Sequence, residues 1–277
     1  MNILVFGKNG FLASKLKSNF HKKNIRAKFI GSNDIDLTKK NSAKKLKKYN
    51  KKYFIIFLSA LTPDKGKDEK TFLKNILMIT NLFEYLSAKN IEHFLYISSD
   101  AVYNLNQIRI NNYTTPSPSD LYGLMHLSRE NICSFNILKK NLTILRPTIV
   151  YGKGDTHNSY GPNRFIGQLK NNQNIKIFGK GLDLRDHLYV NDLIKIISKA
   201  ISKKISGTYN VASGNSYKFI EVVKKIRKLT KKKINVEYIK VNNEPTKRYF
   251  NISQTKKIFK INFTNLSLGL KKYLNKL

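Results

Sequence analysis

Residues 1–13 read MNILVFGKNGFLA and pass from an apolar run through a glycine-containing turn into a helical pattern. Residues 2–6 have the composition of a buried β-strand. The apolar positions after the turn are spaced like one face of a helix, at Leu12, Leu16 and Phe20. This stretch therefore predicts a strand, a tight turn and a helix in direct succession.

The turn has the spacing G-x-x-G-x-x-A. Gly7 permits the tight turn, Gly10 lets the backbone approach a pyrophosphate, and the small Ala13 lets helix and strand pack closely. The start of the helix then offers free N–H groups and a favourable dipole to a phosphate. A plain glycine-rich turn is the alternative, but the position directly after the first strand favours a dinucleotide-binding loop.

Apolar, β-rich runs alternate with helical patterns along the chain. There are six such runs, at residues 2–6, 25–30, 53–60, 93–99, 142–147 and 207–212. The segment LKNILMITNLFEYLSAKN (73–90), between the third and the fourth run, has an apolar helical face. Strands alternating with helices predict an α/β fold of the Rossmann type, a doubly wound parallel sheet covered on both faces.

The alternation is interrupted by the polar loop 153–163 and resumes only near residue 207. We therefore expect residues 1–150, with 182–212 returning to them, to form a dinucleotide-binding domain. Residues 151–181 and 213–277 are expected to form a smaller C-terminal substrate-binding lobe. In sheets of this kind ligands bind beyond the carboxyl ends of the strands, where the polar loops follow.

The net charge is large and positive. Lys+Arg 52 against Asp+Glu 17 gives +35, a balance that raises the question of a nucleic-acid partner. However, only eight of the basic residues are arginines, and the lysines are spread along the whole chain, as in FIEVVKKIRKLTKKK (219–233), where they fill the polar side of a helical pattern. We interpret the charge as a solvated surface that would also attract phosphate-bearing small molecules, and expect no nucleic-acid partner.

Other classes of protein are disfavoured by what the sequence lacks. It has one cysteine, Cys133, so neither an internal disulfide nor a multi-cysteine metal site is expected, and His157 has no second ligand at metal spacing. No run of about 18 apolar residues predicts a membrane span. The start has no signal-peptide pattern. We expect a cytoplasmic protein with no membrane contact and no bound metal.

The ordered motifs together resemble the extended short-chain dehydrogenase/reductase family, in its nucleotide-sugar epimerase, dehydratase and reductase branch. The resemblance covers nearly the whole chain. Its motifs are GKNGFLA (7–13), DLT (36–38), FLSA (57–60), SSDAVY (98–103), YGLMHLSRE (122–130), LRPTIVYG (145–152), GLDLRDHLYVND (181–192) and GTYNVASG (207–214).

The resemblance implies roles for particular residues. Tyr122 would be the general acid/base on a sugar hydroxyl, and Ser99 would hydrogen-bond the same oxygen, with Asp100 and His126 beside them. The implied cofactor-binding residues are Gly7, Asn9, Gly10, Phe11, Leu12, Asp36, Leu58, Ser59, Ala60, Asn75, Tyr122 and His126. The implied substrate-binding residues are Asn163, Arg185 and Arg248, since arginine's forked donors suit a pyrophosphate.

Three positions depart from the family pattern. His126 stands where relatives have a lysine that binds the nicotinamide ribose and lowers the pKa of the tyrosine. A free histidine has a pKa of about 6.5 and is only partly cationic near pH 7. His126 is expected either to donate a hydrogen bond to the ribose or only to pack, leaving weak catalysis. Ala101 replaces an acid usual in dehydratases, which argues against 4,6-dehydration, and Ile149 replaces an asparagine that touches the sugar nucleotide.

The predicted activity is NAD(P)-dependent epimerisation of a nucleotide-activated sugar through a keto intermediate. The alternatives are a reductase of a keto-sugar nucleotide that uses NADPH, and a cofactor-binding protein with weak or lost catalysis. NAD is the expected cofactor and NADP is not excluded, since Lys8 and Ser32 would tolerate a 2′-phosphate whereas Asp34 and Asp36 would oppose one. The resemblance also implies a possible homodimer through a helix bundle that includes the Tyr122 helix.

Overall fold

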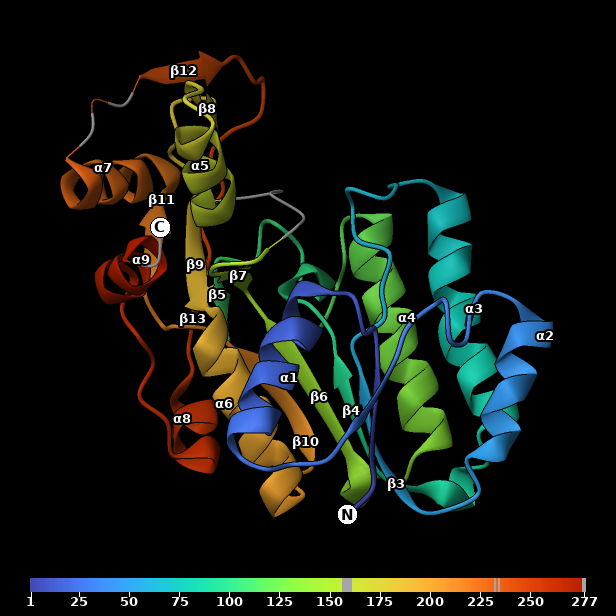
Figure 1. The fold of residues 1–277 in the computed structure, drawn as a ribbon. Coiled ribbons are helices and arrows are strands. Elements are labelled where there is room, and N and C mark those ends of the chain that lie inside the picture. Colours follow the sequence, from blue (N-terminus) through green and yellow to red (C-terminus); the bar gives the residue numbers. More distant parts are fainter. Residues whose placement is uncertain (156–160, 232, 234, 276–277) are drawn as a thin grey trace. The chain divides into compact units, whose positions relative to one another are not determined.

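The computed structural model describes residues 1–155, 161–231, 233 and 235–275 (Figure 1). These residues form two compact units. The first unit comprises residues 1–104, 115–146 and 194–209, and the second comprises the described residues of 105–114, 147–193 and 210–277.

A six-stranded sheet is the centre of the first unit. The order of its strands is β10-β6-β4-β3-β1-β2, and the pairs β1/β2, β1/β3, β3/β4 and β4/β6 are parallel. The strands are β1 (Ile3–Phe6), β2 (Lys28–Ile30), β3 (Tyr53–Phe57), β4 (Ile91–Ile97), β6 (Leu142–Pro147) and β10 (Gly207–Val211). All six expected strands are confirmed, and the order reverses around β1, so a ligand crevice is expected at the carboxyl ends of β1 and β3.

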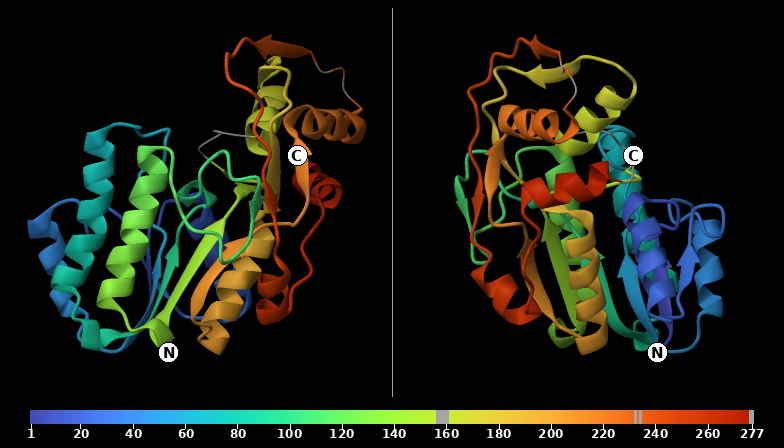
Figure 2. Two further views of the ribbon diagram at one scale, coloured as in Figure 1. Left: turned by 180° about the vertical axis from the view of Figure 1, so that it is seen from behind. Right: turned by 60° about the vertical axis from the view of Figure 1, so that its left-hand side comes forward.

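Helices cover both faces of this sheet (Figures 1 and 2). On one face lie α1 (Phe11–Lys22) and α6 (Val190–Lys203), joined by a hydrogen bond from Ser198 Oγ to Asn19 Oδ1 of 2.9 Å. On the other face α3 (Glu69–Tyr85) packs against α4 (Leu121–Asn136), with α2 (Lys40–Ala43) next to α3. This is the expected Rossmann-type arrangement.

The core beneath α3 and α4 follows from the two-residue alternation of the strands. Alternate residues of β1, β3 and β4 point to the same face, and bury completely against the helices. This cluster includes Leu4, Phe6, Ile55, Phe57, Phe94, Tyr96, Ile79, Leu82 and Cys133. Tyr96 carries a polar hydroxyl in this apolar cluster. The hydroxyl is directed toward His126 of α4.

The second unit is built from short strands and helices. Its three-stranded sheet has the order β11-β9-β7, from β7 (Ile149–Tyr151), β9 (Leu184–Tyr189) and β11 (Ser216–Lys218). Two further pairs join β8 (Ile175–Phe178) to β12 (Val236–Ile239) and β5 (Arg109–Ile110) to β13 (Tyr249–Phe250). Its helices are α5 (Gly161–Lys170), α7 (Phe219–Thr230), α8 (Ser253–Phe259) and α9 (Leu266–Leu274).

The boundary between the units differs from the expected one at residues 105–114, 147–150, 182–193 and 210–212, all of which lie in the second unit. Residues 182–193 were expected with the first domain, but β9 pairs with β7 and β11 and so belongs to the second unit. Residues 105–114 also lie in the second unit, because β5 pairs with β13. Neither pairing is visible in the local pattern, because it joins segments that lie far apart in the sequence.

Candidate active site

The glycine loop lies at the point where the strand order reverses. Gly7 has a φ of +108°, and a Cβ at this position would lie 3.1 Å from the backbone of Leu58 and Ser59. The N–H groups of Gly7 and Lys8 donate to Ile30 O at 2.9 and 3.2 Å. The loop is therefore wedged between the ends of β2 and β3, and only glycine fits at position 7.

Gly10 needs a different explanation. As the residue before α1 it has an ordinary φ of −79°, and its added Cβ would lie 3.4 Å from Gly7 O. Neither backbone conformation nor packing within the protein therefore demands glycine here. The missing side chain leaves the first turn of α1 open, with no side-chain cap and no acidic residue in that turn. This arrangement fits a close-lying pyrophosphate, so the residues present suit a dinucleotide.

Two aspartates follow β2, and they occupy different surroundings. Asp34 turns back to the glycine loop, where its Oδ2 accepts from Lys8 Nζ at 3.3 Å and from Gly31 N at 3.0 Å. These hydrogen bonds hold the pKa of the Asp34 carboxyl below its usual value. The Oδ1 of Asp36 instead accepts from the N–H and the hydroxyl of Thr38, at 3.0 and 2.6 Å. Asp34 thus brings a negative charge to the loop, and Asp36 stabilises a turn.

The segment after β3, Leu58 to Ala60, is held by two buried side chains. Asn75 Oδ1 accepts from Leu61 N at 2.8 Å and from Arg129 Nη2 at 3.1 Å, while its Nδ2 donates to Leu61 O and Thr71 O. Arg129 Nη1 donates to Ser59 O at 2.7 Å. Because all four hydrogen-bonding positions of the Asn75 amide are used, its side chain positions the segment, and has none left for the direct cofactor contact expected from the sequence.

Tyr122 and Ser99 are brought together by the start of α4. Asp120 caps this helix by accepting from Gly123 N at 2.7 Å, and the side chain of Ser99 lies close enough to the Tyr122 phenol to act on its pKa. A Cβ on Gly123 would lie 2.1 Å from Ala101 O, so only glycine lets α4 pack onto the 3₁₀ turn Asp100–Val102. The sequence reasoning missed Gly123, although a glycine directly after Tyr122 indicates such a close approach.

The surroundings of Tyr122 do not favour its ionised form. Burial raises the pKa of the phenol, and the negative charge of Asp100 raises it further. The charge of Arg129 and the nearby Ser99 side chain act in the opposite direction and lower the pKa. As a base, Tyr122 therefore needs a further positive charge close to it.

His126 does not supply that charge. Its side chain is 2% exposed, and its ring lies edge-on to the Tyr122 ring with centroids 4.7 Å apart. Burial, assisted by the charge of Arg129, lowers its pKa to about 3. The expectation that His126 is partly cationic near pH 7 is therefore corrected: the imidazole is neutral there, because a buried cation would lose its hydration.

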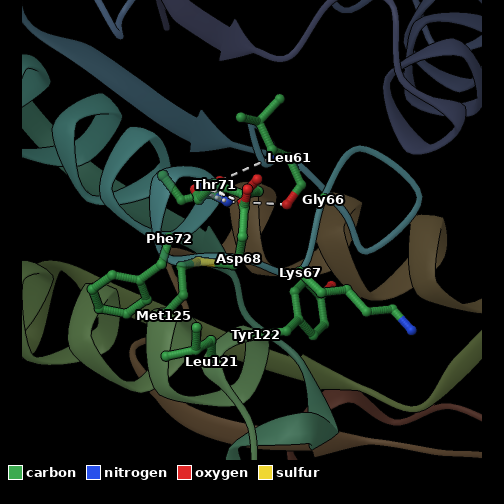
Figure 3. A pocket seen from close by; sticks show the side chains of 10 residues that line it. Leu61, Gly66, Lys67, Asp68, Thr71, Phe72, Leu121, Tyr122 and Met125 are labelled. Atoms are coloured by element: carbon green, nitrogen blue, oxygen red, sulfur yellow. Dashed lines mark hydrogen bonds between the residues drawn. The ribbon is translucent and has the colours of Figure 1, made fainter.

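A pocket opens beside Tyr122 (Figure 3). Residues at the start of α4 line one side of it, and the segment leading into α3 lines the other. The lining residues are Leu61, Gly66, Lys67, Asp68, Thr71, Phe72, Asn75, Leu121, Tyr122 and Met125. Tyr122 and the exposed Lys67 thus border the same small cavity within the first unit.

The three expected substrate residues lie in the second unit. Arg248 N donates to Leu184 O at 3.1 Å, which brings Arg248 next to Arg185. The guanidinium of Arg185 donates to Thr246 O at 3.1 Å and forms an ion pair with Asp183 at 3.5 Å, while that of Arg248 lies 5.7 Å from the ring centroid of Phe250.

Asn163 is 3% exposed, and its amide forms hydrogen bonds within the protein. Its Oδ1 accepts from Gly152 N at 3.0 Å, and its Nδ2 donates to Val150 O and to Asp155 Oδ2. It therefore fastens the end of β7, and its expected contact with the substrate stays a prediction. His157 lies outside the described residues. Within the described ranges, no three metal-ligating side chains are grouped closely enough to hold a metal ion.

A parallel sheet with a glycine loop at its reversal point is the arrangement of dinucleotide-binding α/β proteins. The family model for the NAD dependent epimerase/dehydratase family matches residues 3–212. The chain therefore belongs to this family of NAD-dependent enzymes. Across the described part of the chain, no helix is both long and apolar enough to cross a membrane.

Individual relatives share little more than a quarter of the residues. The chain is 28% identical over 229 residues to a GDP-6-deoxy-D-talose 4-dehydrogenase of Aggregatibacter actinomycetemcomitans, covering 80% of this chain and 78% of the relative. It is 27% identical over 191 residues to an uncharacterised UDP-glucose epimerase of Bacillus subtilis. That match covers 66% of this chain but only 60% of the relative's length.

Solved structures share the fold. A UDP-glucose 4-epimerase of Thermus thermophilus in complex with NAD superposes with a TM-score of 0.86, covering 99% of this chain and 98% of that chain at 16% identity. A UDP-glucuronic acid 4-epimerase mutant of Bacillus cereus gives a TM-score of 0.83, with the same coverage at 23% identity. At these identities the likeness concerns the fold alone.

Proposed function

We propose that this protein is an NAD-dependent epimerase of a nucleotide-activated sugar. The observation that carries the proposal is the nearness of Ser99 to Tyr122, a tyrosine that borders a pocket in a family member whose glycine loop fits a dinucleotide. The names of the relatives support a sugar nucleotide as the substrate class.

The chain's own residues have separate tasks in this proposal. Gly7 shapes the turn, Gly10 leaves room for the pyrophosphate at the first turn of α1, and the segment Leu58–Ala60 lines the adenine side. Bound NAD would supply the group that takes a hydride from the sugar and gives it back. Tyr122 Oη takes the proton of the sugar hydroxyl and later returns it, while Ser99 Oγ holds the same oxygen.

Arg185 and Arg248 remain the predicted ligands of the substrate's pyrophosphate. The two are adjacent and carry the charge that a pyrophosphate requires. Epimerisation is favoured over 4,6-dehydration because Ala101 leaves Asp100 without the neighbouring acid of the dehydratases. Reduction of a keto-sugar with NADPH is the remaining alternative, and the charge of Asp34 at the glycine loop disfavours NADPH.

Turnover of a panel of UDP-, GDP-, dTDP- and ADP-activated sugars with added NAD tests the proposal. We expect a product of unchanged mass with inverted stereochemistry in the proton NMR spectrum and no net NADH. Tyr122→Phe should reduce the rate by about 10²–10⁴-fold, the usual contribution of a general acid/base. Tyr113→Phe, at a tyrosine that is 86% exposed, is the matched control. Stoichiometric consumption of NADPH would identify a reductase, and binding without turnover would identify a cofactor-binding protein.

A further inference from the structure

The two ring nitrogens of His126 have unequal surroundings. Its Nδ1 lies 2.7 Å from Tyr96 Oη, which comes from the middle of the central sheet. Its Nε2 is buried and has no hydrogen-bond partner among the described residues. Leaving a buried polar atom unpaired is unfavourable, so the unpaired nitrogen points to a partner that the described residues do not provide.

The proton between Tyr96 and His126 can lie on either side, and the tautomer decides what Nε2 does. If Tyr96 donates to Nδ1, then Nε2 carries the ring proton and is a donor. If Nδ1 donates to Tyr96, then Nε2 is an acceptor. The structure records heavy atoms, so the choice follows from the charges around Tyr96.

Arg129 decides the direction. This residue is fully buried on α4, and its positive charge acts on the Tyr96 oxygen. A phenol beside a cation turns its oxygen lone pairs to that cation and its proton away from it. The Tyr96 proton is therefore directed to His126 Nδ1. Tyr96 cannot ionise at neutral pH, because burial raises its pKa well above the ordinary value.

Arg129 itself cannot turn away from this position. Its Nε donates to Asn75 O at 2.9 Å and its Nη1 donates to Ser59 O at 2.7 Å, which fixes the guanidinium between α3 and the end of β3. The guanidinium also lies 5.3 Å from the ring centroid of Phe57. A fixed cation, Arg129, is thus followed by two neutral groups, Tyr96 and then His126.

We propose that Tyr96 is a positioning residue that holds His126 as the neutral tautomer protonated on Nε2, and that this N–H donates to a ribose hydroxyl of the dinucleotide. The assignment of the ribose rests on the proposed function, whereas the tautomer does not. The positive charge of Arg129 polarises the hydrogen bond from Tyr96 to His126. The Nε2 N–H of His126 is therefore a stronger donor, without a cation beside the ribose. Tyr96 and His126 together thus bind the ribose, the task that the resemblance gives to a lysine. They do not lower the pKa of Tyr122, which has to come from other charges.

The tautomer is measured in the protein without added nucleotide. With ¹⁵N-labelled histidine, long-range proton–nitrogen correlation distinguishes a protonated Nε2 from a protonated Nδ1, and the signals of His126 are those lost in His126→Gln. We expect a protonated Nε2 in the unsubstituted protein and a mixture of tautomers in Tyr96→Phe. A protonated Nδ1 in the unsubstituted protein would overturn the inference.

The affinity for NAD provides the second readout. Tyr96→Phe should weaken NAD binding about ten-fold in a calorimetric titration, the effect of losing roughly one hydrogen bond. The matched control is Tyr209→Phe, which also removes a buried phenol hydrogen bond, from Tyr209 Oη to Ser206 O at 2.7 Å, and should leave tautomer and affinity unchanged.

The failures of the two proposals are distinguishable. If Tyr96→Phe binds NAD as tightly as the unsubstituted protein and keeps one tautomer, then Tyr96 does not position His126. If the unsubstituted protein binds neither NAD nor NADP, the proposed function and the ribose assignment fail together. The tautomer spectrum alone then decides whether Tyr96 and Arg129 orient the ring.

Discussion

His126 and Tyr122 lie one helical turn apart, and together they set the pH range in which this site can work. The imidazole is neutral at physiological pH because burial lowers its pKa to about 3. The pKa of the phenol is raised by burial, so the deprotonated form becomes populated only as the pH rises. The rate of any reaction that uses Tyr122 as a base should therefore increase with pH through the neutral and alkaline range.

His126→Lys should move the rising part of the pH–rate profile to lower pH. A cation next to Tyr122 stabilises the phenolate and lowers its pKa, by about one to three pH units for a close opposite charge. His126→Gln, which keeps the position neutral, should leave the profile in place. An active His126→Lys protein with an unshifted profile would show that Tyr122 is not the titrating base.

Asp34 should set the preference between the two dinucleotides. Its carboxylate lies 3.3 Å from Lys8 Nζ at the glycine loop, where it would repel a 2′-phosphate and occupy the lysine. In Asp34→Ala, the affinity for NADP should rise about ten-fold relative to that for NAD, measured by fluorescence titration. Asp64→Ala, at another aspartate paired with a lysine, is the control. An unchanged ratio would exclude Asp34 from the ribose side of the site.

At the scale of the elements, α4 is fastened to the sheet by a buried ion pair. Arg146 at the end of β6 donates to both carboxylate oxygens of Glu130, from Nε at 2.9 Å and from Nη2 at 2.6 Å. Ser98 Oγ donates to the same carboxylate, and Arg146 Nη1 donates to Tyr103 Oη at 2.7 Å. This network holds the helix that carries Tyr122 and His126 against the strand ends.

Glu130→Ala should lower the free energy of unfolding by about 3–5 kcal/mol, because Arg146 is left buried without its counter-charge. The measurement is chemical denaturation followed by circular dichroism. Glu92→Ala removes a more exposed ion pair, with Lys204, and should cost about 0–1 kcal/mol. Equal losses of unfolding free energy in the two variants would contradict the role of this network in holding α4 to the sheet.

The sequence predicted the elements of the first unit better than those of the second. The six parallel strands are continuous apolar runs because both of their faces are buried, and this pattern is local. In contrast, β9 mixes Arg185, Asp186 and His187 with apolar residues and gave no strand pattern. The carboxylate of Asp186 is buried there and accepts hydrogen bonds from Ser213, Gly214 and Asn215. Only the folded chain brings these segments together.

The candidate site shows the same limit. Tyr122, Ser99 and the glycine loop are recognisable from short motifs, since each lies where a strand ends or a helix begins. The partnership of Tyr96 with His126 depends on which face of β4 is turned to α4, and the hydrogen bonds of the Asn75 and Asn163 amides depend on contacts with other segments. These roles depend on how the segments pack, so a local sequence pattern does not predict them.

The outer sides of α3 and α4 carry exposed apolar side chains. They are Leu73, Leu77, Leu124 and Phe135, which are 58%, 45%, 41% and 91% exposed. We propose a homodimer through this surface. The net charge of +35 opposes self-association, so dimerisation should strengthen with added salt, which screens the repulsion.

Sedimentation velocity tests the dimer directly. Phe135→Glu combined with Leu77→Glu should give a monomer, because the charges prevent burial of the surface. Leu268→Glu, at a residue of α9 that is 43% exposed, should leave the dimer intact. A monomeric unsubstituted protein at micromolar concentration and moderate salt would contradict the proposal.

If the protein is the proposed epimerase, it should keep its dinucleotide through purification. Freshly purified protein is denatured, and the released nucleotides are identified by chromatography. An enzyme that returns the hydride to its own product has no need to exchange the cofactor, so we predict near-stoichiometric NAD. Empty protein that then binds NADPH would contradict the epimerase in favour of a reductase. Protein that binds neither dinucleotide at millimolar concentration would contradict the whole account.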